Sequence, residues 1–274
     1  MCDTCGCNIT PGNEFLIKND GKLSRTADGR AAVSVLKGLL SENDNQAAHN
    51  RAHFDRRGIL AVNLMSSPGS GKTRLLEATI EALKGEFGIA VVEGDLETEN
   101  DAERVRAKGV KAIQIATGSA CHLDAHMVHD ALHNLPLDGI DIVFIENVGN
   151  LVCPASFDLG HHRNVILLSV VEGADKPAKY PVMFRAADLL LITKSDLLPF
   201  LDDFDPAAAE GHLRALACRA PVVQLSASKG LGMDGWFDWL RAEVRAQRER
   251  VAAGDSVTPQ VAPDTHDHHQ HAHG

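Results

Sequence analysis

The chain has 274 residues, of which 44% are hydrophobic, so it is long enough to bury the core of a full globular domain. Its formal net charge of −10, without any basic block, argues against nucleic acid as a main partner. No signal peptide is visible and no apolar run is long enough to span a bilayer, so we expect a cytoplasmic protein without a membrane partner.

Three of the six cysteines, Cys2, Cys5 and Cys7, lie within the first seven residues. In a reducing compartment such cysteines are thiols or metal ligands rather than disulfides. Thiolates at this spacing can surround one transition metal, with a peptide nitrogen or the α-amine completing the shell. The thiolate count favours zinc, whereas a planar set of thiolates and nitrogens suits nickel or copper. The alternative is a reactive terminus that binds no metal.

The residues after these cysteines, up to residue 29, are polar and contain glycine and proline, which is typical of a linker. We therefore treat residues 1–29 as one unit, a metal-binding terminus with its linker. An apolar stripe over residues 31–40 predicts one helix, and a weaker pattern over residues 41–57 predicts a second. Residues 30–57 are thus expected to form a helical extension.

Residues 58–250 alternate between strand and helix patterns, which predicts an α/β domain with a mostly parallel, doubly wound sheet and helices on both faces. The expected strands are residues 59–65, 89–93, 112–116, 140–146, 165–171, 189–193 and 222–225. The expected helices are residues 72–84, 98–107, 123–133, 206–217 and 233–250. In such sheets ligands bind at the carboxyl ends of the strands.

A glycine-rich turn with the sequence SSPGSGKT, residues 66–73, joins the first of these strands to the first helix. This order of strand, turn and helix is typical of the phosphate-binding loop of P-loop NTPases, although Ser66 replaces the usual first glycine. Lys72 is expected to reach the β- and γ-phosphates, and the hydroxyl of Thr73 is expected to ligate Mg²⁺. The backbone N–H groups expected to cradle the phosphates belong to Gly69, Ser70 and Gly71.

Two further strand ends carry carboxylates that suit triphosphate chemistry. Asp95 follows the second strand, where it can orient the attacking water or join the magnesium shell; a helix N-cap is the alternative. Glu146 closes the fourth strand, and Gly149 follows three residues later with an N–H expected to reach the γ-phosphate. Because glutamate replaces the commoner aspartate, the magnesium contact of Glu146 is expected to run through water.

The base is expected to be guanine. Lys194 follows the sixth strand and would flank the purine, while the carboxylate of Asp196 would accept hydrogen bonds from guanine N1 and its amine. Adenine has the opposite donor pattern and would leave this carboxylate unpaired. Thr193 replaces the usual asparagine at the start of this motif. After the last strand, Ser226 and Ala227 resemble a loop that contacts guanine O6, with an ordinary turn as the alternative.

A second group of potential metal ligands follows the third and fourth strands. Cys121 and His122 are adjacent, His126 lies one helical turn further, and Cys153 comes four residues after Gly149. Two cysteines with one or two histidines suit zinc or nickel. Buried cysteines are more often ordinary core residues, but both of these are expected in turns after strands.

Taken together, the ordered motifs resemble the HypB family, the nickel-insertion GTPases of hydrogenase maturation. The resemblance covers residues 1–7 and about 58–245 and includes Glu93-Gly94-Asp95 and the segments 144–155 and 172–177. It implies GTP hydrolysis, GTP-dependent formation of a homodimer, and delivery of Ni²⁺ to the large subunit of a [NiFe]-hydrogenase. It also implies a HypA-type nickel chaperone as a partner. Mg²⁺ is expected beside the phosphates, and turnover is expected to be slow because no arginine is placed as a finger.

The same resemblance implies roles for the cysteine motifs. Cys2, Cys5 and Cys7 would bind nickel tightly, and a second site near the dimer interface, for nickel or zinc, would consist of Cys121, His122 and Cys153. Leu197 and Leu201 would match an apolar dimer contact, with core packing as the alternative.

Residues 251–274 have no hydrophobic periodicity and are expected to form a disordered tail. Five histidines lie within residues 266–273, which favours a labile nickel buffer over an engineered tag. Two other functions remain open. A nickel storage protein with a regulatory nucleotide site would explain the cysteines and the tail, and a urease-type nickel GTPase is disfavoured by the terminal cysteines.

Overall fold

The structure is a computed structural model, and it describes residues 32–95, 100–118 and 120–259. Cys2, Cys5, Cys7 and the histidines of residues 266–273 therefore lie outside the described residues. Among the residues that are described, no helix has both the length and the apolar character needed to cross a bilayer.

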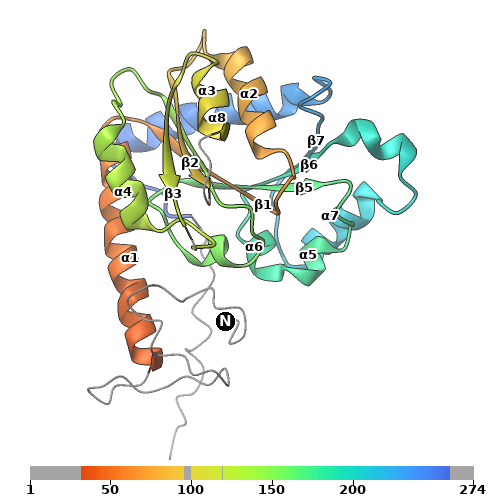
Figure 1. The fold of residues 1–274 in the computed structure, drawn as a ribbon, viewed down its shortest axis with the longest axis horizontal. Coiled ribbons are helices and arrows are strands. Elements are labelled where there is room, and N and C mark those ends of the chain that lie inside the picture. The colour runs from red at the N-terminus through yellow and green to blue at the C-terminus, as the bar shows by residue number, and fades with distance from the viewer. Residues whose placement is uncertain (1–31, 96–99, 119, 260–274) are drawn as a thin grey trace, which may run out of the picture.

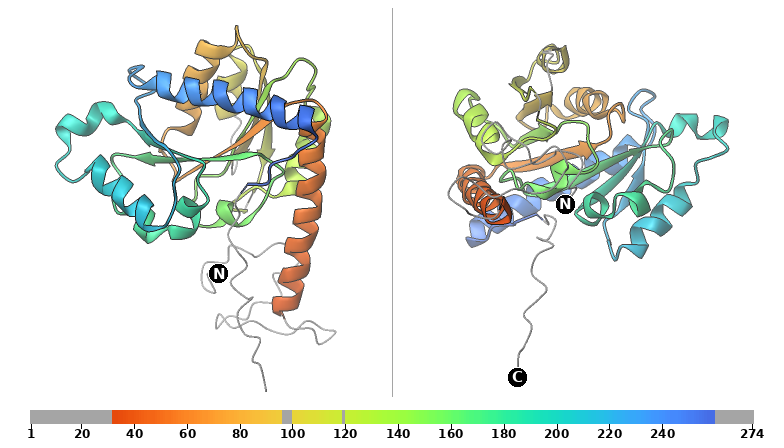
Figure 2. Two further views of the ribbon diagram at one scale, coloured as in Figure 1. Left: turned by 180° about the vertical axis from the view of Figure 1, so that it is seen from behind. Right: turned by 60° about the horizontal axis from the view of Figure 1, so that its bottom comes forward.

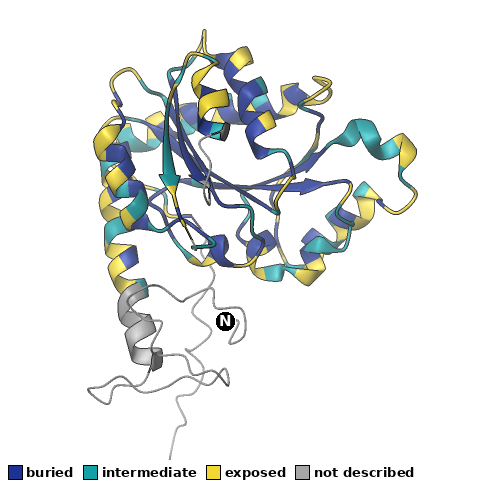
Figure 3. Cartoon of the chain, in the orientation of Figure 1, coloured by how far each residue is buried: buried dark blue, intermediate teal, exposed yellow. Residues whose placement is uncertain are grey.

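The described strands form one parallel sheet of seven strands in the order β3-β2-β4-β1-β5-β6-β7. The strands are β1 (Leu60–Ser66), β2 (Ile89–Asp95), β3 (Lys111–Ala116), β4 (Ile142–Glu146), β5 (Arg163–Ser169), β6 (Leu189–Thr193) and β7 (Val222–Gln224). Each of the seven strands expected from the sequence is present, with ends that differ by no more than two residues. The central strands are buried throughout, as the dark ribbons of Figure 3 show, because helices cover both faces.

Five of the helices follow strands as expected. They are α2 (Lys72–Leu83), α3 (Asn100–Arg106), α4 (Ala125–Asn134), α7 (Pro206–Ala215) and α8 (Met233–Ala253). Helix α8 packs on the same core cluster as α2, and Trp236 donates a hydrogen bond to Thr79 at 2.9 Å. The left view of Figure 2, which turns the molecule by 180°, brings α8 to the viewer's side of the sheet.

Several short helices were not expected from the sequence. They are the 3₁₀ segments η2 (Cys153–Ser156) and η3 (Ser195–Phe200) and the helices α5 (Lys176–Lys179) and α6 (Pro181–Arg185). Each spans only four to six residues, which is too short for a periodic apolar pattern.

The extension before β1 is one helix, α1 (Ala32–Asp55), so the expectation of two helices over residues 31–40 and 41–57 is wrong. The polar stretch in its middle interrupts the apolar pattern but not the helix, because most of its side chains are exposed and the buried Asn43 has hydrogen-bond partners. The side chain of Asn43 donates to the carbonyl of Asp158 at 2.9 Å and accepts from the N–H of Ala125 at 2.9 Å. These bonds fix α1 against the N-terminus of α4, which lies beside it in Figures 1 and 2.

Candidate nucleotide and metal site

The phosphate-binding loop lies between the end of β1 and the start of α2, as expected. Gly69 and Gly71 have φ values of 75° and 98°, a left-handed conformation that favours glycine, and Gly71 is the N-cap of α2. Lys72 is buried, and its ammonium donates to the hydroxyl of Ser66 at 3.1 Å. The serine that replaces the usual glycine therefore supplies a polar partner for the lysine within the loop.

A carboxylate to which the sequence analysis assigned no role also contacts this loop. Glu172 accepts hydrogen bonds from the hydroxyls of Ser67 and Ser70, the latter at 2.5 Å, and from the N–H of Ser169 at 3.3 Å. Glu172 lies just beyond β5, which pairs with β1. Its position just after a strand is the one sequence feature that could have indicated a role for Glu172. The sequence does not show that β5 lies beside β1, so the contact with the loop could not be predicted.

Thr73 and Glu146 meet as expected for a magnesium site: the threonine hydroxyl donates to Glu146 Oε1 at 3.0 Å. Glu93, on β2, lies directly opposite Glu146 in the sheet register and hydrogen-bonds with it. Burial and the charge of Glu146 raise the pKa of Glu93 to about 11, and burial raises the pKa of Glu146 against the opposing charge of Lys72.

One carboxylate oxygen of each glutamate, Oε2 in both, is buried without a hydrogen-bond partner among the described residues. Two unpartnered carboxylate oxygens beside a threonine hydroxyl suit a hard divalent cation such as Mg²⁺. Asp95 is the last residue of β2, on the same edge of the sheet, but its side chain lies outside the described residues.

Gly149 lies against the phosphate-binding loop. A Cβ at this position would come within 2.8 Å of the Cα of Pro68 and within 2.9 Å of its nitrogen, so only glycine fits. The loop after β4 therefore packs directly on the loop after β1, which places Gly149 next to the phosphate-binding segment.

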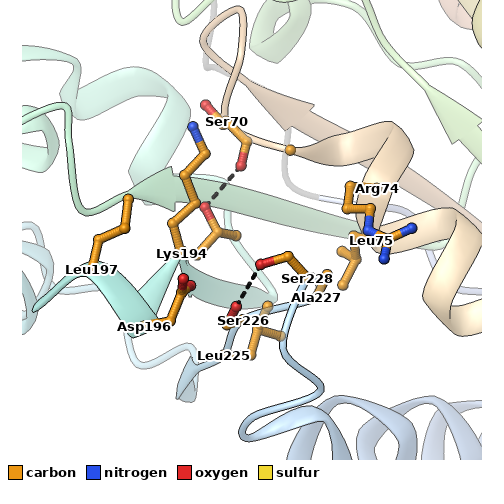
Figure 4. A pocket seen from close by; sticks show the side chains of 12 residues that line it. Ser70, Arg74, Leu75, Lys194, Asp196, Leu197, Leu225, Ser226, Ala227 and Ser228 are labelled. Atoms are coloured by element: carbon orange, nitrogen blue, oxygen red, sulfur yellow. Dashed lines mark hydrogen bonds between the residues drawn. The ribbon is translucent and has the colours of Figure 1, made fainter.

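The base-recognition motif lines a cavity of about 180 Å³ beside the phosphate-binding loop (Figure 4). The carboxylate oxygen Oδ1 of Asp196 is buried there without a hydrogen-bond partner in the described part of the chain. Lys194 has a φ of 58° and donates to the carbonyl of Gly69 at 2.8 Å. Thr193, which replaces the usual asparagine, donates to the carbonyl of Ser70 at 2.8 Å and so joins β6 to the loop.

Ser226 and Ala227 line the opposite side of the cavity, together with Ser228, whose hydroxyl is 3.1 Å from that of Ser226. Leu197 also lines the cavity, and both Leu197 and Leu201 pack on a core cluster. In the single chain, both leucines therefore pack on the core, which was the alternative to a dimer contact. The neighbouring Phe200 is 82% exposed.

The expected metal ligands Cys121, His122 and Cys153 converge, with all three ligand atoms within 4.8 Å of one another. The ring of His122 stacks on Phe157 at a centroid distance of 4.0 Å, and burial lowers its pKa, which favours the neutral imidazole that metals bind. His126 is not part of this group, because α4 begins only after the N-cap Asp124 and carries His126 on its exposed side.

Two asparagines that the sequence analysis did not single out join the metal group to the loop after β4. Asn147 accepts from the N–H groups of Leu123 at 3.2 Å and Val148 at 3.0 Å, and Asn150 donates to the carbonyl of Cys121 at 3.3 Å. The same loop therefore touches Pro68 through Gly149 and holds the Cys121 segment through Asn150.

Residues 60–224 match the family described as CobW/HypB/UreG, nucleotide-binding domain. The hydrogenase maturation factor HypB of Rhizobium leguminosarum bv. viciae is 51% identical over 222 residues, which span 80% of this chain and 74% of that protein. HypB of Escherichia coli strain K12 is 51% identical over 214 residues, covering 78% and 73% of the two chains.

Among solved structures, HypB from Helicobacter pylori in complex with nickel is similar to this chain, with a TM-score of 0.71 and 40% sequence identity. The similarity covers 76% of this chain and 97% of the Helicobacter chain. HypB from Archaeoglobus fulgidus gives a TM-score of 0.70 at the same identity. The chain therefore belongs to the CobW/HypB/UreG family and, within it, to the HypB hydrogenase maturation factors.

Proposed function

We propose that this chain is a GTP-hydrolysing nickel metallochaperone that delivers Ni²⁺ to the large subunit of a [NiFe]-hydrogenase. The observation that carries this proposal is the shared loop after β4, which contacts the phosphate-binding loop at Gly149 and the metal group at Asn150 and Cys153. A storage protein with an unrelated nucleotide site would not need this connection.

Guanine is the base that this cavity suits. The buried, unpartnered oxygen of Asp196 requires a donor, and guanine offers its N1–H and its exocyclic amine. Adenine presents an acceptor at N1, so it would leave a buried carboxylate unsatisfied. Lys194 and the Ser226–Ala227 turn would contact the purine face and guanine O6, respectively.

Hydrolysis depends on charge neutralisation and positioning around the phosphates. Lys72 would bind the β- and γ-phosphates, and the loop amides of residues 69–71 would hold the phosphate oxygens in place. Thr73 and Glu146 would hold Mg²⁺, with Asp95 in its shell or on the attacking water; the ion would neutralise charge on the transferring phosphoryl group. Turnover is expected to be slow because Arg74, the arginine that lines the cavity, is bound to Glu77 at 3.1 Å.

Nickel is the proposed cargo. Cys121, His122 and Cys153 offer two thiolates and one imidazole, a donor set that suits Ni²⁺ or Zn²⁺. The Helicobacter pylori relative was solved in complex with nickel, which supports nickel here. Cys2, Cys5 and Cys7 would form a separate, tighter nickel site, and the histidine-rich tail would act as a buffer.

The proposal includes the organisation and partners expected from the sequence. Residues 1–29 would carry the tight metal site, residues 30–57 the helical extension, residues 58–250 the GTPase domain and residues 251–274 the tail. The chain would work as a homodimer with a HypA-type chaperone and the hydrogenase large subunit precursor. A cytoplasmic location would keep the thiols reduced for metal binding.

The test is to measure GTP turnover and nickel stoichiometry on one purified sample of the full chain, with Lys72→Ala and Asp196→Asn beside it. We expect slow hydrolysis of GTP but not ATP, and a loss of about a hundredfold or more in Lys72→Ala. Asp196→Asn should weaken GTP binding and improve binding of xanthosine triphosphate, whose C2 carbonyl replaces the amine. Both variants should bind as much nickel as the wild type.

Lys84→Ala is the matched control, since Lys84 is exposed at the other end of α2. Equal affinities for ATP and GTP would disprove the base assignment. Hydrolysis that survives Lys72→Ala would disprove the catalytic mechanism. Nickel binding without any GTP turnover in the wild type would favour the storage function instead.

A further inference from the structure

Five histidines gather where α1 and α4 pack together, well separated in sequence from the terminal cysteines. They form the α1–α4 histidine cluster: His49, His53, His126, His129 and His133. The rings of His49 and His129 are 5.2 Å apart between centroids, and those of His129 and His133 are 4.5 Å apart. None of these residues belongs to the Cys121–His122–Cys153 group.

His129 and His133, both on α4, have their Nε2 atoms facing each other. Nε2 of His129 and Nε2 of His133 are 3.0 Å apart, and the residues are one helical turn apart on one face. A metal ion binds imidazole nitrogens at about 2.0–2.1 Å, so two neighbouring ligands at a right angle are about 3 Å apart. The existing separation therefore fits two ligands of one ion with little movement of either side chain.

Buried contacts of Asn50 determine which nitrogen of His129 carries the proton. The amide nitrogen of Asn50 donates to the carbonyls of Ala125 at 2.8 Å and Leu159 at 3.1 Å, which fixes the orientation of this amide. Its oxygen is therefore the atom that faces Nδ1 of His129, at 3.2 Å, so Nδ1 must donate. Nε2 of His129 is left with its lone pair directed at His133, and a hydrogen bond to the other ring nitrogen is the usual support of a metal-binding histidine.

His49 offers a third imidazole from the neighbouring helix. It is exposed on α1, so its side chain has room to turn a ring nitrogen toward the His129–His133 pair, and its ring already meets that of His129 edge to face.

We propose that His129 and His133, with His49 as the third ligand, form a surface binding site for Ni²⁺ on the α1–α4 face. An all-imidazole set binds borderline divalent ions, and because it lacks thiolates it should release them more readily than the cysteine sites do. The site would hold cargo at the domain surface, outside both cysteine groups. This inference goes beyond the proposed function and requires neither GTP nor its hydrolysis.

The experiment isolates this site in the full-length chain. The background protein carries serine in place of the cysteines of both other sites and alanine in place of the five tail histidines; the replaced cysteines are Cys2, Cys5, Cys7, Cys121 and Cys153. Equilibrium dialysis against NiCl₂ without nucleotide, followed by metal analysis, gives stoichiometry and affinity. Because no nucleotide is present, failure of the proposed GTPase function would leave this measurement unchanged.

We expect the background protein to bind one equivalent of Ni²⁺. His133→Ala should weaken binding at least about tenfold, the scale of losing a metal-site contact, and His129→Ala/His133→Ala should abolish it. His49→Ala should weaken it to a smaller extent. His212→Ala on α7, a histidine outside the cluster, should have no effect.

Circular dichroism and thermal unfolding check that each variant is folded. If the double variant does not fold, the single change at the exposed His133 decides the matter. Nickel binding that is absent from the background protein, or unchanged in His133→Ala, overturns the site. Unchanged affinity in His49→Ala overturns the role of His49 as the third ligand, and binding of Zn²⁺ but not Ni²⁺ overturns the assignment of the cargo.

Discussion

Glu93 and Glu146 face each other on neighbouring strands, and their shared burial makes it costly to ionise both carboxyls. The pKa of Glu93 is raised to about 11, so in the folded protein without nucleotide this group stays protonated at neutral pH. In the unfolded chain the same carboxyl has an ordinary pKa near 4.5. The contribution of Glu93 to the stability of the folded state is therefore fully present below about pH 4.5, and it is lost as the pH rises from about 4.5 toward 11.

Glu93→Gln should remove this pH dependence, because a glutamine cannot ionise and its amide can still donate to Glu146. The stability of the variant should match that of the wild type near pH 4.5 and exceed it at pH 7, by at most about 3 kcal/mol. Urea unfolding between pH 4.5 and 8 measures the difference. The control Glu103→Gln, exposed on α3, should show none, and a variant that is less stable than the wild type at pH 7 would contradict the argument.

The same pair shows which site residues the sequence could identify. Glu146 could be recognised because it closes an apolar strand three residues before Gly149. The partnership of Glu93 depends on β2 lying beside β4, and that of Glu172 on β5 lying beside β1, which are facts of strand order rather than chain order. Glu146 belongs to a local motif and was predicted, whereas the role of Glu172 and the pairing of Glu93 with Glu146 depend on strand order and were not.

At the scale of elements, the inner strands of the sheet were predicted well because both of their faces are buried and their apolar runs are nearly continuous. The sequence pattern predicted two helices where α1 is one, because the buried face of α1 carries polar side chains beside Ala47 and Phe54. Arg51 binds Asp158 through its guanidinium at 2.7 Å and reaches the carbonyl of His161 at 3.4 Å, and Arg51 and Asp158 are both buried. A helix that packs through buried ion pairs and amides shows no clear hydrophobic stripe.

Arg51→Ala should therefore destabilise the protein strongly, by about 3–5 kcal/mol, because it leaves the buried carboxylate of Asp158 without its partner. Chemical denaturation at pH 7 gives the free energy of unfolding. Arg56→Ala is the matched control, since Arg56 is an exposed arginine in the turn just after the same helix, and it should change this free energy by less than about 0.5 kcal/mol. A loss below about 1 kcal/mol in Arg51→Ala would show that α1 is not held by this pair.

At the scale of the whole molecule, the sheet order brings the nucleotide and metal groups onto one loop. β4 lies between β2 and β1, so the loop after β4 reaches Pro68 on one side and the Cys121 segment on the other. The sequence placed Gly149 and Cys153 four residues apart and so indicated this connection, but not the hydrogen bonds of Asn147 and Asn150 that complete it.

This connection predicts that nickel affinity depends on the nucleotide. Loss of the γ-phosphate contact at Gly149 should let the loop relax, as switch segments of GTPases do, and should move Cys153 relative to Cys121 and His122. Nickel should then bind the domain site with different affinities in GDP and in a non-hydrolysable GTP analogue. By linkage, nickel must change the relative affinity for the two nucleotides by the same factor.

The measurement uses the full-length chain with serine at Cys2, Cys5 and Cys7, alanine at the tail histidines and the double change His129→Ala/His133→Ala, so that only the domain site is titrated. Asn150→Ala removes the hydrogen bond to Cys121 and should reduce the difference between the two nucleotide states, whereas Asn134→Ala, exposed at the end of α4, should leave it intact. Equal nickel affinities in both states, with equal dimer fractions, would make the domain site a static structural one. A nucleotide effect that persists in Asn150→Ala would instead place the coupling in the Cys153 side of the loop, since only three residues separate Gly149 from Cys153.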